Sequence, residues 1–305
     1  MLREFALISF TILAQMSVGA FLVLGLVRFF VARKAGQEEA DRMCDRSLVA
    51  VVIILGLGMV ASLFHLAHPL SAPRAITNFA TSWLSREILS GSVFFALSGV
   101  YMVLQLFKLG PAVLRTVVAW LAALVGVVFV YNMSMIYMLP TQPAWDSLAT
   151  PVSFFTTALL LGLLSMGAAF VANYSYVKRK DPSCADVQCQ LLRSTLRSIA
   201  VASVILLGVE LVVIPVYLVS LASGSPQAIA SARLISGQYG LVFLLRVVLA
   251  FAGAGVFGFF LYQNTQKDGN DPVLGFNAYT AFALVFVAEV LGRFIFYATQ
   301  IGISL

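Results

Sequence analysis

Both histidines of the chain, His65 and His68, lie within four residues, and Arg86 and Glu87 follow further along the same segment. Long apolar runs flank this segment on either side. A neutral imidazole accepts a proton readily near pH 6.5, and a nearby carboxylate can orient it or accept a second proton. The combination therefore predicts proton-transfer chemistry at the edge of an apolar region.

The surrounding elements are predicted to be transmembrane helices. Hydrophobic residues make up 61% of the 305 residues, charged residues 10%, and the mean hydropathy is +0.97. Apolar runs long enough to cross a hydrocarbon core of about 30 Å recur along the chain, and their continuous patterning does not fit a β-barrel. We expect an all-α integral membrane protein with a single domain, 1–305. Its eight predicted helices are 5–31, 47–66, 87–107, 113–133, 152–177, 197–221, 239–262 and 276–301.

Lysine and arginine predict the orientation of this bundle. The loops after the first, third, fifth and seventh helices hold twelve of them, and the opposite side holds four. Basic residues remain on the cytoplasmic side, so both termini are expected in the periplasm and the protein in a bacterial inner membrane. The net charge of +6 then reflects an anionic inner leaflet and not a nucleic-acid partner.

This topology places the titratable cluster at the periplasmic interface. His65 and His68 fall at the outer end of the second helix, and Glu87 falls in the first turn of the third. The preceding hydroxyl residues are candidate caps for that helix: Thr81, Ser82 and Ser85. From position alone, a capping or interfacial role for His65 without chemistry is an equal alternative.

We expect no metal in the chain. Two histidines at i and i+3 point the same way and cannot hold a haem from its two faces. The three cysteines, Cys44, Cys184 and Cys189, fall in loops of the reducing side without a histidine to complete a zinc or iron–sulphur site, so they are predicted to be ordinary thiols.

Polar residues at membrane depth form a second set of candidates. They are Gln15, Glu210, Arg246, Glu289 and Arg293, whereas Arg28 lies near enough to the inner end to reach the interface. Glu289 and Arg293 stand at i and i+4 on one helix, a spacing at which side chains meet. They are predicted to form an ion pair that fixes helix packing, with a proton path as the alternative.

Quinol oxidation fits an imidazole and a carboxylate at a membrane interface. A quinol is soluble in lipid, and its oxidation releases two electrons and two protons. The electrons require a redox centre that this chain is not expected to contain, so a partner subunit must dock on the outer face. Gln15 is a weaker candidate for a hydrogen bond to a quinone oxygen, and Arg86 is expected to pair with Glu87, to steer the substrate, or to lie in the headgroup zone.

The sequence resembles the membrane anchor subunits of DMSO reductase-type molybdoenzymes, the DmsC family, over essentially its whole length. The likeness is carried by "LISFTILAQMSVGAF", "ASLFHLAHPL", "TSWLSREILSGSVFFA", "YMLPTQPAWDSLATPVSFF", "GVEL" and "AEVLGRFIFY". The resemblance implies an eight-helix anchor without haem and with external termini, which oxidises menaquinol. It also implies two periplasmic partners, an iron–sulphur subunit with 4Fe-4S clusters and a molybdopterin catalytic subunit, in anaerobic respiration.

His65 and Glu87 match the quinol-site histidine and acidic residue of this family, whereas the position of His68 commonly holds another residue. Ser71 and Ala80 stand where basic residues are expected, and Pro73 where an aromatic is expected. Fewer loop cations imply either an altered contact with the iron–sulphur subunit or a different complex within the superfamily.

Two other classes of protein compete with this interpretation. A polysulfide or nitrite reductase-type anchor would retain quinone chemistry with different partners, but its motifs are not evident. A secondary transporter is suggested by Glu210, Glu289 and Pro215, since a proline could mark a broken helix. We find no convincing internal repeat, and the histidine cluster lies at the surface and not at the midplane.

Overall fold

The computed structural model describes residues 2–65, 76–180, 185–264 and 271–303, and every regular element in these ranges is helical. The elements are α1 (Leu2–Ala35), α2 (Gln37–His65), η2 (Ile76–Asn78), α4 (Trp83–Leu106), α5 (Ala112–Met135), α6 (Ala149–Lys180), α7 (Ala185–Ala222), α8 (Pro226–Ser236), α9 (Gly240–Ala250), η4 (Phe251–Phe257), α10 (Gly258–Asn264) and α11 (Asp271–Ala298). Within the described ranges, eight helical segments are long and apolar enough to cross a membrane. The predicted eight-helix architecture is therefore confirmed.

Two helices begin well before their predicted starts. α2 begins at Gln37 and α7 at Ala185, each about ten residues earlier than the apolar run that defined them. The polar turns of α2 are held by ion pairs: Arg42 contacts Glu38 at 2.8 Å, and Arg28 on α1 contacts Asp45 at 3.0 Å. Hydropathy locates the part of a helix that lies in lipid, so it misses turns that continue beyond the hydrocarbon.

The seventh span consists of α9, the π-helical segment η4 and α10 in succession. Gly253 lies in this segment against α11, where a Cβ would meet Val285 at 2.7 Å and the Ala281 carbonyl oxygen at 3.0 Å. A π-helical turn is a common local adjustment inside a membrane helix.

Two prolines, Pro215 inside α7 and Pro226 at the start of α8, have different effects on the helices. α7 runs without a break from Ala185 to Ala222, through Pro215, so the broken helix that suggested a transporter is not present. The short helix α8 was not predicted, although Ser225 accepts a hydrogen bond from Ala228 N and Pro226 stands at the first turn. A serine followed by proline is a typical helix start, which an apolar-run search does not detect.

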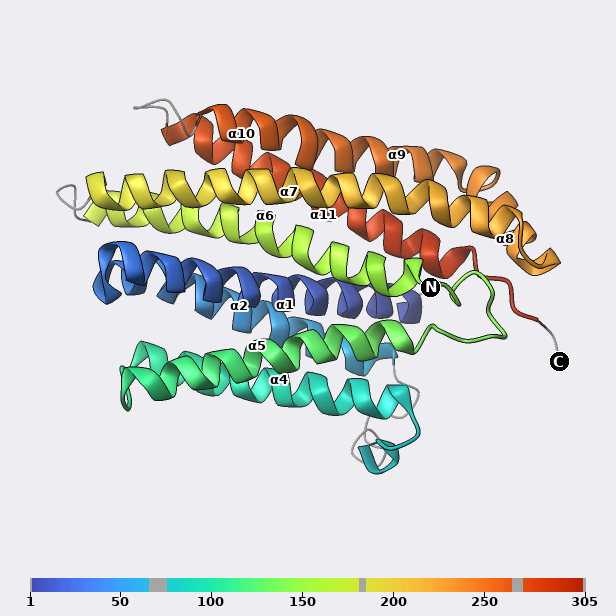
Figure 1. Cartoon of the computed structure of the whole chain (residues 1–305), viewed down its shortest axis with the longest axis horizontal. Coiled ribbons are helices and arrows are strands. Elements are labelled where there is room, and N and C mark those ends of the chain that lie inside the picture. The colour runs from blue at the N-terminus through green and yellow to red at the C-terminus, as the bar shows by residue number, and fades with distance from the viewer. Residues whose placement is uncertain (1, 66–75, 181–184, 265–270, 304–305) are drawn as a thin grey trace.

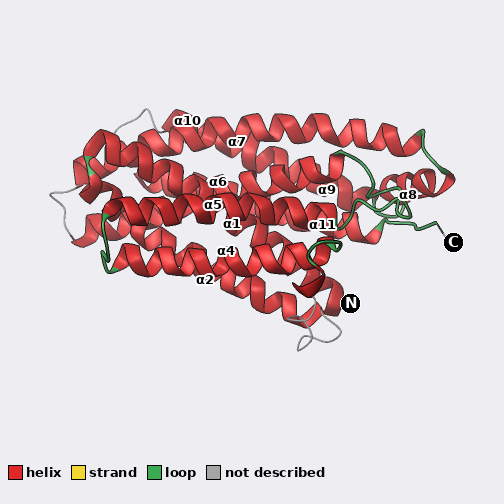
Figure 2. Ribbon diagram, turned by 60° about the horizontal axis from the view of Figure 1, so that its bottom comes forward, coloured by secondary structure: helices red, strands yellow, loops and turns green. Residues whose placement is uncertain are grey.

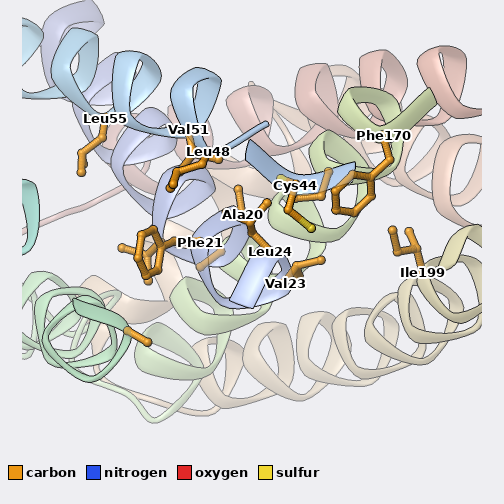
Figure 3. Close-up of a cluster of buried hydrophobic side chains, with 14 of the residues drawn as sticks. Ala20, Phe21, Val23, Leu24, Cys44, Leu48, Val51, Leu55, Phe170 and Ile199 are labelled. Atoms are coloured by element: carbon orange, nitrogen blue, oxygen red, sulfur yellow. The ribbon is translucent and has the colours of Figure 1, made fainter. Parts of the chain in front are cut away.

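α1 lies at the centre of the bundle, between α2 and α6 (Figure 1). α4 and α5 pack together on one side, and α7, α9, α10 and α11 lie on the other (Figures 1 and 2). Aliphatic and aromatic side chains of α1, α2 and α6 fill the interior, among them Leu24, Leu48 and Phe170 (Figure 3). Outward-facing Phe64 and Val113 are each 72% exposed, as expected for surfaces that face lipid.

Both termini lie at the same end of the bundle, together with η2, α8 and the connection from α5 to α6 (Figure 1). This agrees with an even number of spans. We call it the outer end, because the positive-inside rule predicts that it faces the periplasm; that orientation stays a prediction.

Candidate functional site

Glu87 lies inside the bundle at its outer end. α4 begins at Trp83, with Ser82 as the N-cap that accepts a hydrogen bond from Ser85 N at 3.4 Å. Of the three candidate caps, Thr81, Ser82 and Ser85, the structure thus selects Ser82. Glu87 consequently stands in the second turn and not in the first, so it does not bind the free N–H groups of the helix start. Its side chain is 6% exposed and shares the buried face of α4 with Ser90 and Phe94.

The Glu87 carboxylate makes no hydrogen bond to any residue in the described part of the chain. Its electrostatic interactions are with the hydroxyl groups of Tyr137 and Tyr297. These two hydroxyls share a hydrogen bond of 2.8 Å, which joins the end of α5 to α11. A buried carboxylate without a partner is costly, and such groups are found preferentially where a site must hold or transfer a proton.

Aromatic rings surround the ring of Tyr137. The Tyr137 ring lies 5.2 Å from those of Trp145 and Phe296 and 5.6 Å from that of Phe154. This burial raises the pKa of Tyr137 well above its usual range, and the neighbouring Tyr297 and Glu87 act in the same direction. Tyr137 therefore stays protonated at working pH and can donate a hydrogen bond.

Arg86 faces the preceding loop. Its guanidinium donates to the carbonyl oxygens of Phe79 at 2.8 Å and Ala80 at 2.7 Å, and it stacks over the ring of Trp83 at 4.2 Å. Of the expected roles, these contacts favour a positional one in the headgroup zone. A direct pair with Glu87 is not formed.

His65 is the last residue of α2, and the end of α2 lies at the same end of the bundle as the start of α4, which carries Glu87 (Figure 1). α2 and α4 contact one another. The side chain of His65 lies outside the described residues, as do His68, Ser71, Pro73 and Arg74.

Gln15 belongs to a buried polar network that links α1 to α11. Its side chain is fully buried, and its Oε1 accepts a hydrogen bond from Arg293 Nη2 at 2.9 Å. The Arg293 guanidinium also lies over the ring of Phe154 at 3.7 Å and acts electrostatically on Tyr137 and Tyr297. Arg293, which binds Gln15, and Glu87 thus act electrostatically on the same tyrosine pair, whereas no hydrogen bond joins Gln15 to Glu87 in the described part of the chain.

The predicted contact between Glu289 and Arg293 is wrong. Glu289 accepts a hydrogen bond from Thr157 on α6 at 2.7 Å, whereas Arg293 donates to Gln15. Buried charged groups on membrane helices bind donors and acceptors on neighbouring helices, which also hold those helices together. The i, i+4 spacing allows a contact but does not decide the rotamer.

Among the polar residues at membrane depth, Glu210 and Arg246 form an ion pair. Arg246 Nη2 lies 2.6 Å from Glu210 Oε1, so the pair joins α7 to α9. The guanidinium of Arg246 rests against Gly292 on α11, where a Cβ would meet its Nε at 2.5 Å. A side chain at position 292 would therefore displace the guanidinium of Arg246.

A cavity of about 90 Å³ lies beside this ion pair, bounded by α6, α7, α9 and α11. Four charged side chains line it, and each has one buried polar atom without a hydrogen-bond partner among the described residues: Glu210 Oε2, Arg246 Nε, Glu289 Oε1 and Arg293 Nε. Buried water occupies sites of this kind, because each molecule satisfies about three polar groups and needs roughly 10–15 Å³. The cavity can hold a few water molecules next to Glu289.

Sequence reasoning did not identify Tyr137, Tyr297 and Thr157. Tyr137 and Tyr297 lie inside the segments "YMLPTQPAW" and "GRFIFY", but hydroxyl groups carry no charge and were not sought at depth. Among the described residues, no group of three or more His, Cys, Asp or Glu side chains could hold a metal ion.

The protein matches the family model described as DMSO reductase anchor subunit (DmsC) over residues 1–299. It is 30% identical to YnfH, an anaerobic dimethyl sulfoxide reductase polypeptide of Escherichia coli K12, covering 99% of this chain and 97% of the relative. It is 28% identical to a polypeptide of the anaerobic dimethyl sulfoxide reductase of Haemophilus influenzae, covering 97% and 94%. A shorter match, 30% identical over 34% of this chain and 32% of the relative, is to a polypeptide of the sulfite dehydrogenase of Allochromatium vinosum.

Proposed function

Because the chain belongs to the DMSO reductase anchor subunit (DmsC) family, we propose that it oxidises menaquinol at the outer end of its bundle. The chain is a multi-pass protein of the inner membrane and the anchor of a DMSO reductase-type complex. We propose that electrons pass from menaquinol to an iron–sulphur subunit and then to a molybdopterin catalytic subunit, both docked on the periplasmic face. In this scheme the anchor does not itself reduce the terminal acceptor.

The observation that carries the proposal is the buried Glu87 carboxylate, which has no hydrogen-bond partner in the described part of the chain and acts electrostatically on the hydrogen-bonded pair Tyr137 and Tyr297. Conversion of menaquinol to menaquinone releases two protons and two electrons. Glu87 accepts one phenolic proton as a general base. His65, through the family resemblance, accepts the other, and both electrons leave to a cluster of the partner subunit.

We propose different roles for the two deep carboxylates. Glu210 is tied to Arg246 and holds α7 to α9. One oxygen of Glu289 is bound by Thr157, the other has no partner among the described residues, and Glu289 lines a cavity with room for water. That arrangement suits a carboxylate that exchanges protons with water, so Glu289 is the stronger candidate for a proton path behind the tyrosine pair.

The proposal is tested by replacing Glu87 with Gln and His65 with Ala in the complete complex. A menaquinol analogue supplies electrons through this chain, whereas a reduced viologen supplies them directly to the partner subunits. We expect quinol-dependent reduction of a sulfoxide to fall more than tenfold in both variants, while viologen-dependent reduction and membrane attachment are unchanged.

Glu38→Gln is the matched control, because Glu38 is an exposed glutamate near the opposite end of the bundle whose one ion pair among the described residues is with Arg42. It should retain full quinol turnover. Full quinol turnover in Glu87→Gln would show that this carboxylate takes no part in the reaction, and a parallel loss of viologen activity would indicate failed assembly.

A further inference from the structure

A groove of about 430 Å³ lies at the opposite end of the bundle from Glu87, between α1, α4 and α5. It runs beside the end of α1, the end of α4 and the start of α5, which lie together at the end of the molecule away from the termini (Figure 1). None of the residues of the proposed quinol site lines it.

The groove carries positive charge. Its lining includes Arg28, Arg33 and Arg115 but no aspartate or glutamate. Arg28 is already neutralised, because its guanidinium bonds Asp41 and Asp45. Lys108 also contacts both carboxylates, at 2.7 and 2.8 Å, so the two acids are balanced by these two bases.

Arg33 and Arg115 have no carboxylate partner among the described residues. The guanidinium of Arg33 lies over the ring of Phe29 at 4.3 Å. Arg115 Nη1 is buried and makes no hydrogen bond to the described part of the protein. A buried guanidinium nitrogen without an acceptor is costly, and guanidinium groups are strong, often bidentate donors to phosphate oxygens.

Apolar side chains make up much of the rest of the lining, which extends along the helices toward the middle of the membrane and also includes Tyr101, Gln105 and Thr116. The apolar lining of the groove includes Phe21, Leu22, Ala119 and Ala123. The space beside Gly25 is open, since a Cβ on this residue would meet no atom within 4 Å. Phe21 and Arg33 are separated by twelve residues of helix, about 18 Å at 1.5 Å per residue. This length is close to one leaflet, half of a hydrocarbon core of about 30 Å.

We propose that this groove binds an anionic phospholipid, whose phosphate lies between Arg33 and Arg115 and whose acyl chains follow the apolar lining. Basic pockets between membrane helices are known sites for acidic headgroups. A quinone has no anionic group to place against the two arginines, and a free phosphate has nothing to place along the apolar floor. The proposal does not depend on the function proposed above.

The test compares lipids that remain bound to the purified complex, measured by mass spectrometry. We expect the Arg33→Gln/Arg115→Gln double variant to retain at least fivefold less phosphatidylglycerol and cardiolipin per protein than the wild type. The Lys34→Gln/Arg179→Gln double variant removes the same charge at the same end but outside the groove, and it should retain normal amounts. Equal retention in the two double variants would overturn the proposal.

A second variant distinguishes lipid binding inside the groove from electrostatic attraction of lipid to the protein surface. Ala119→Phe fills the apolar part and leaves both arginines in place, so it should also expel the lipid. In addition, phosphatidylglycerol should raise the melting temperature of the wild type more than phosphatidylethanolamine does, and this difference should disappear in both groove variants. Lipid retention in Ala119→Phe, or release of a quinone in place of a phospholipid, would contradict the proposal.

Discussion

The crossing of α1 and α6 at Gly19 and Gly162 should be the most sensitive packing contact in the bundle. A Cβ on Gly19 would overlap the carbonyl oxygen of Ala158, and a Cβ on Gly162 would come within 2.6 Å of Gly19 Cα. Real Cβ atoms essentially never approach another heavy atom within 3.0 Å. Because the obstructing atoms belong to the backbone, Gly19→Ala requires the two helices to move apart by more than an ångström.

The expected cost of Gly19→Ala combines three terms. Alanine gains about 1 kcal/mol over glycine in a helix interior. Overpacking costs about 1–3 kcal/mol where side chains can adjust, and more where only the backbone can move. Separation of α1 also strains the 2.9 Å hydrogen bond from Arg293 to Gln15, one turn before Gly19, and an unsatisfied buried group costs about 1–3 kcal/mol. We expect a net loss of about 3 kcal/mol, or about a hundredfold in the unfolding equilibrium.

The measurement is the unfolding equilibrium of the purified complex in mixed micelles, followed by near-UV circular dichroism. Gly99→Ala is the control, because a Cβ on Gly99 of α4 meets no atom within 4 Å. The stability of the control should be unchanged or slightly increased. Gly19→Ala and Gly162→Ala should both unfold at a much lower denaturant concentration. If Gly19→Ala unfolds together with Gly99→Ala, the close approach of α1 and α6 is wrong.

Three further outcomes are expected from the buried polar groups. Arg246→Met leaves Glu210 buried and unpaired and should destabilise the anchor by about 3–5 kcal/mol, whereas Glu210→Gln/Arg246→Met should restore most of that stability in the same unfolding assay. Tyr137→Phe removes the 2.8 Å bond to Tyr297 and should cost about 1–3 kcal/mol, with slower quinol turnover and unchanged viologen activity. Glu289→Gln should lower the maximal quinol rate and increase its solvent deuterium isotope effect at unchanged KM; an unaltered isotope effect would assign Glu289 to packing alone.

Sequence reasoning located the membrane helices well because each span depends on its own length and hydropathy. All eight spans were predicted, and their outer ends agree with the structure within a few residues. Errors occurred where polar turns continue a helix beyond the lipid, as at Gln37 and Ala185, and where the signal was a local cap, as at Ser225. The position of Glu87 near the outer end of α4 was likewise readable from the residue order.

By itself, the sequence determined that this protein crosses a membrane eight times and that a carboxylate stands near one end of the bundle. Only the tertiary structure decided which groups meet: Arg293 binds Gln15 and not Glu289, Arg246 binds Glu210, and Tyr137 joins Tyr297. The physical reason is that hydropathy is a property of each segment alone. Polar partners depend on how every helix is rotated about its axis, and close packing of all the helices together sets that rotation.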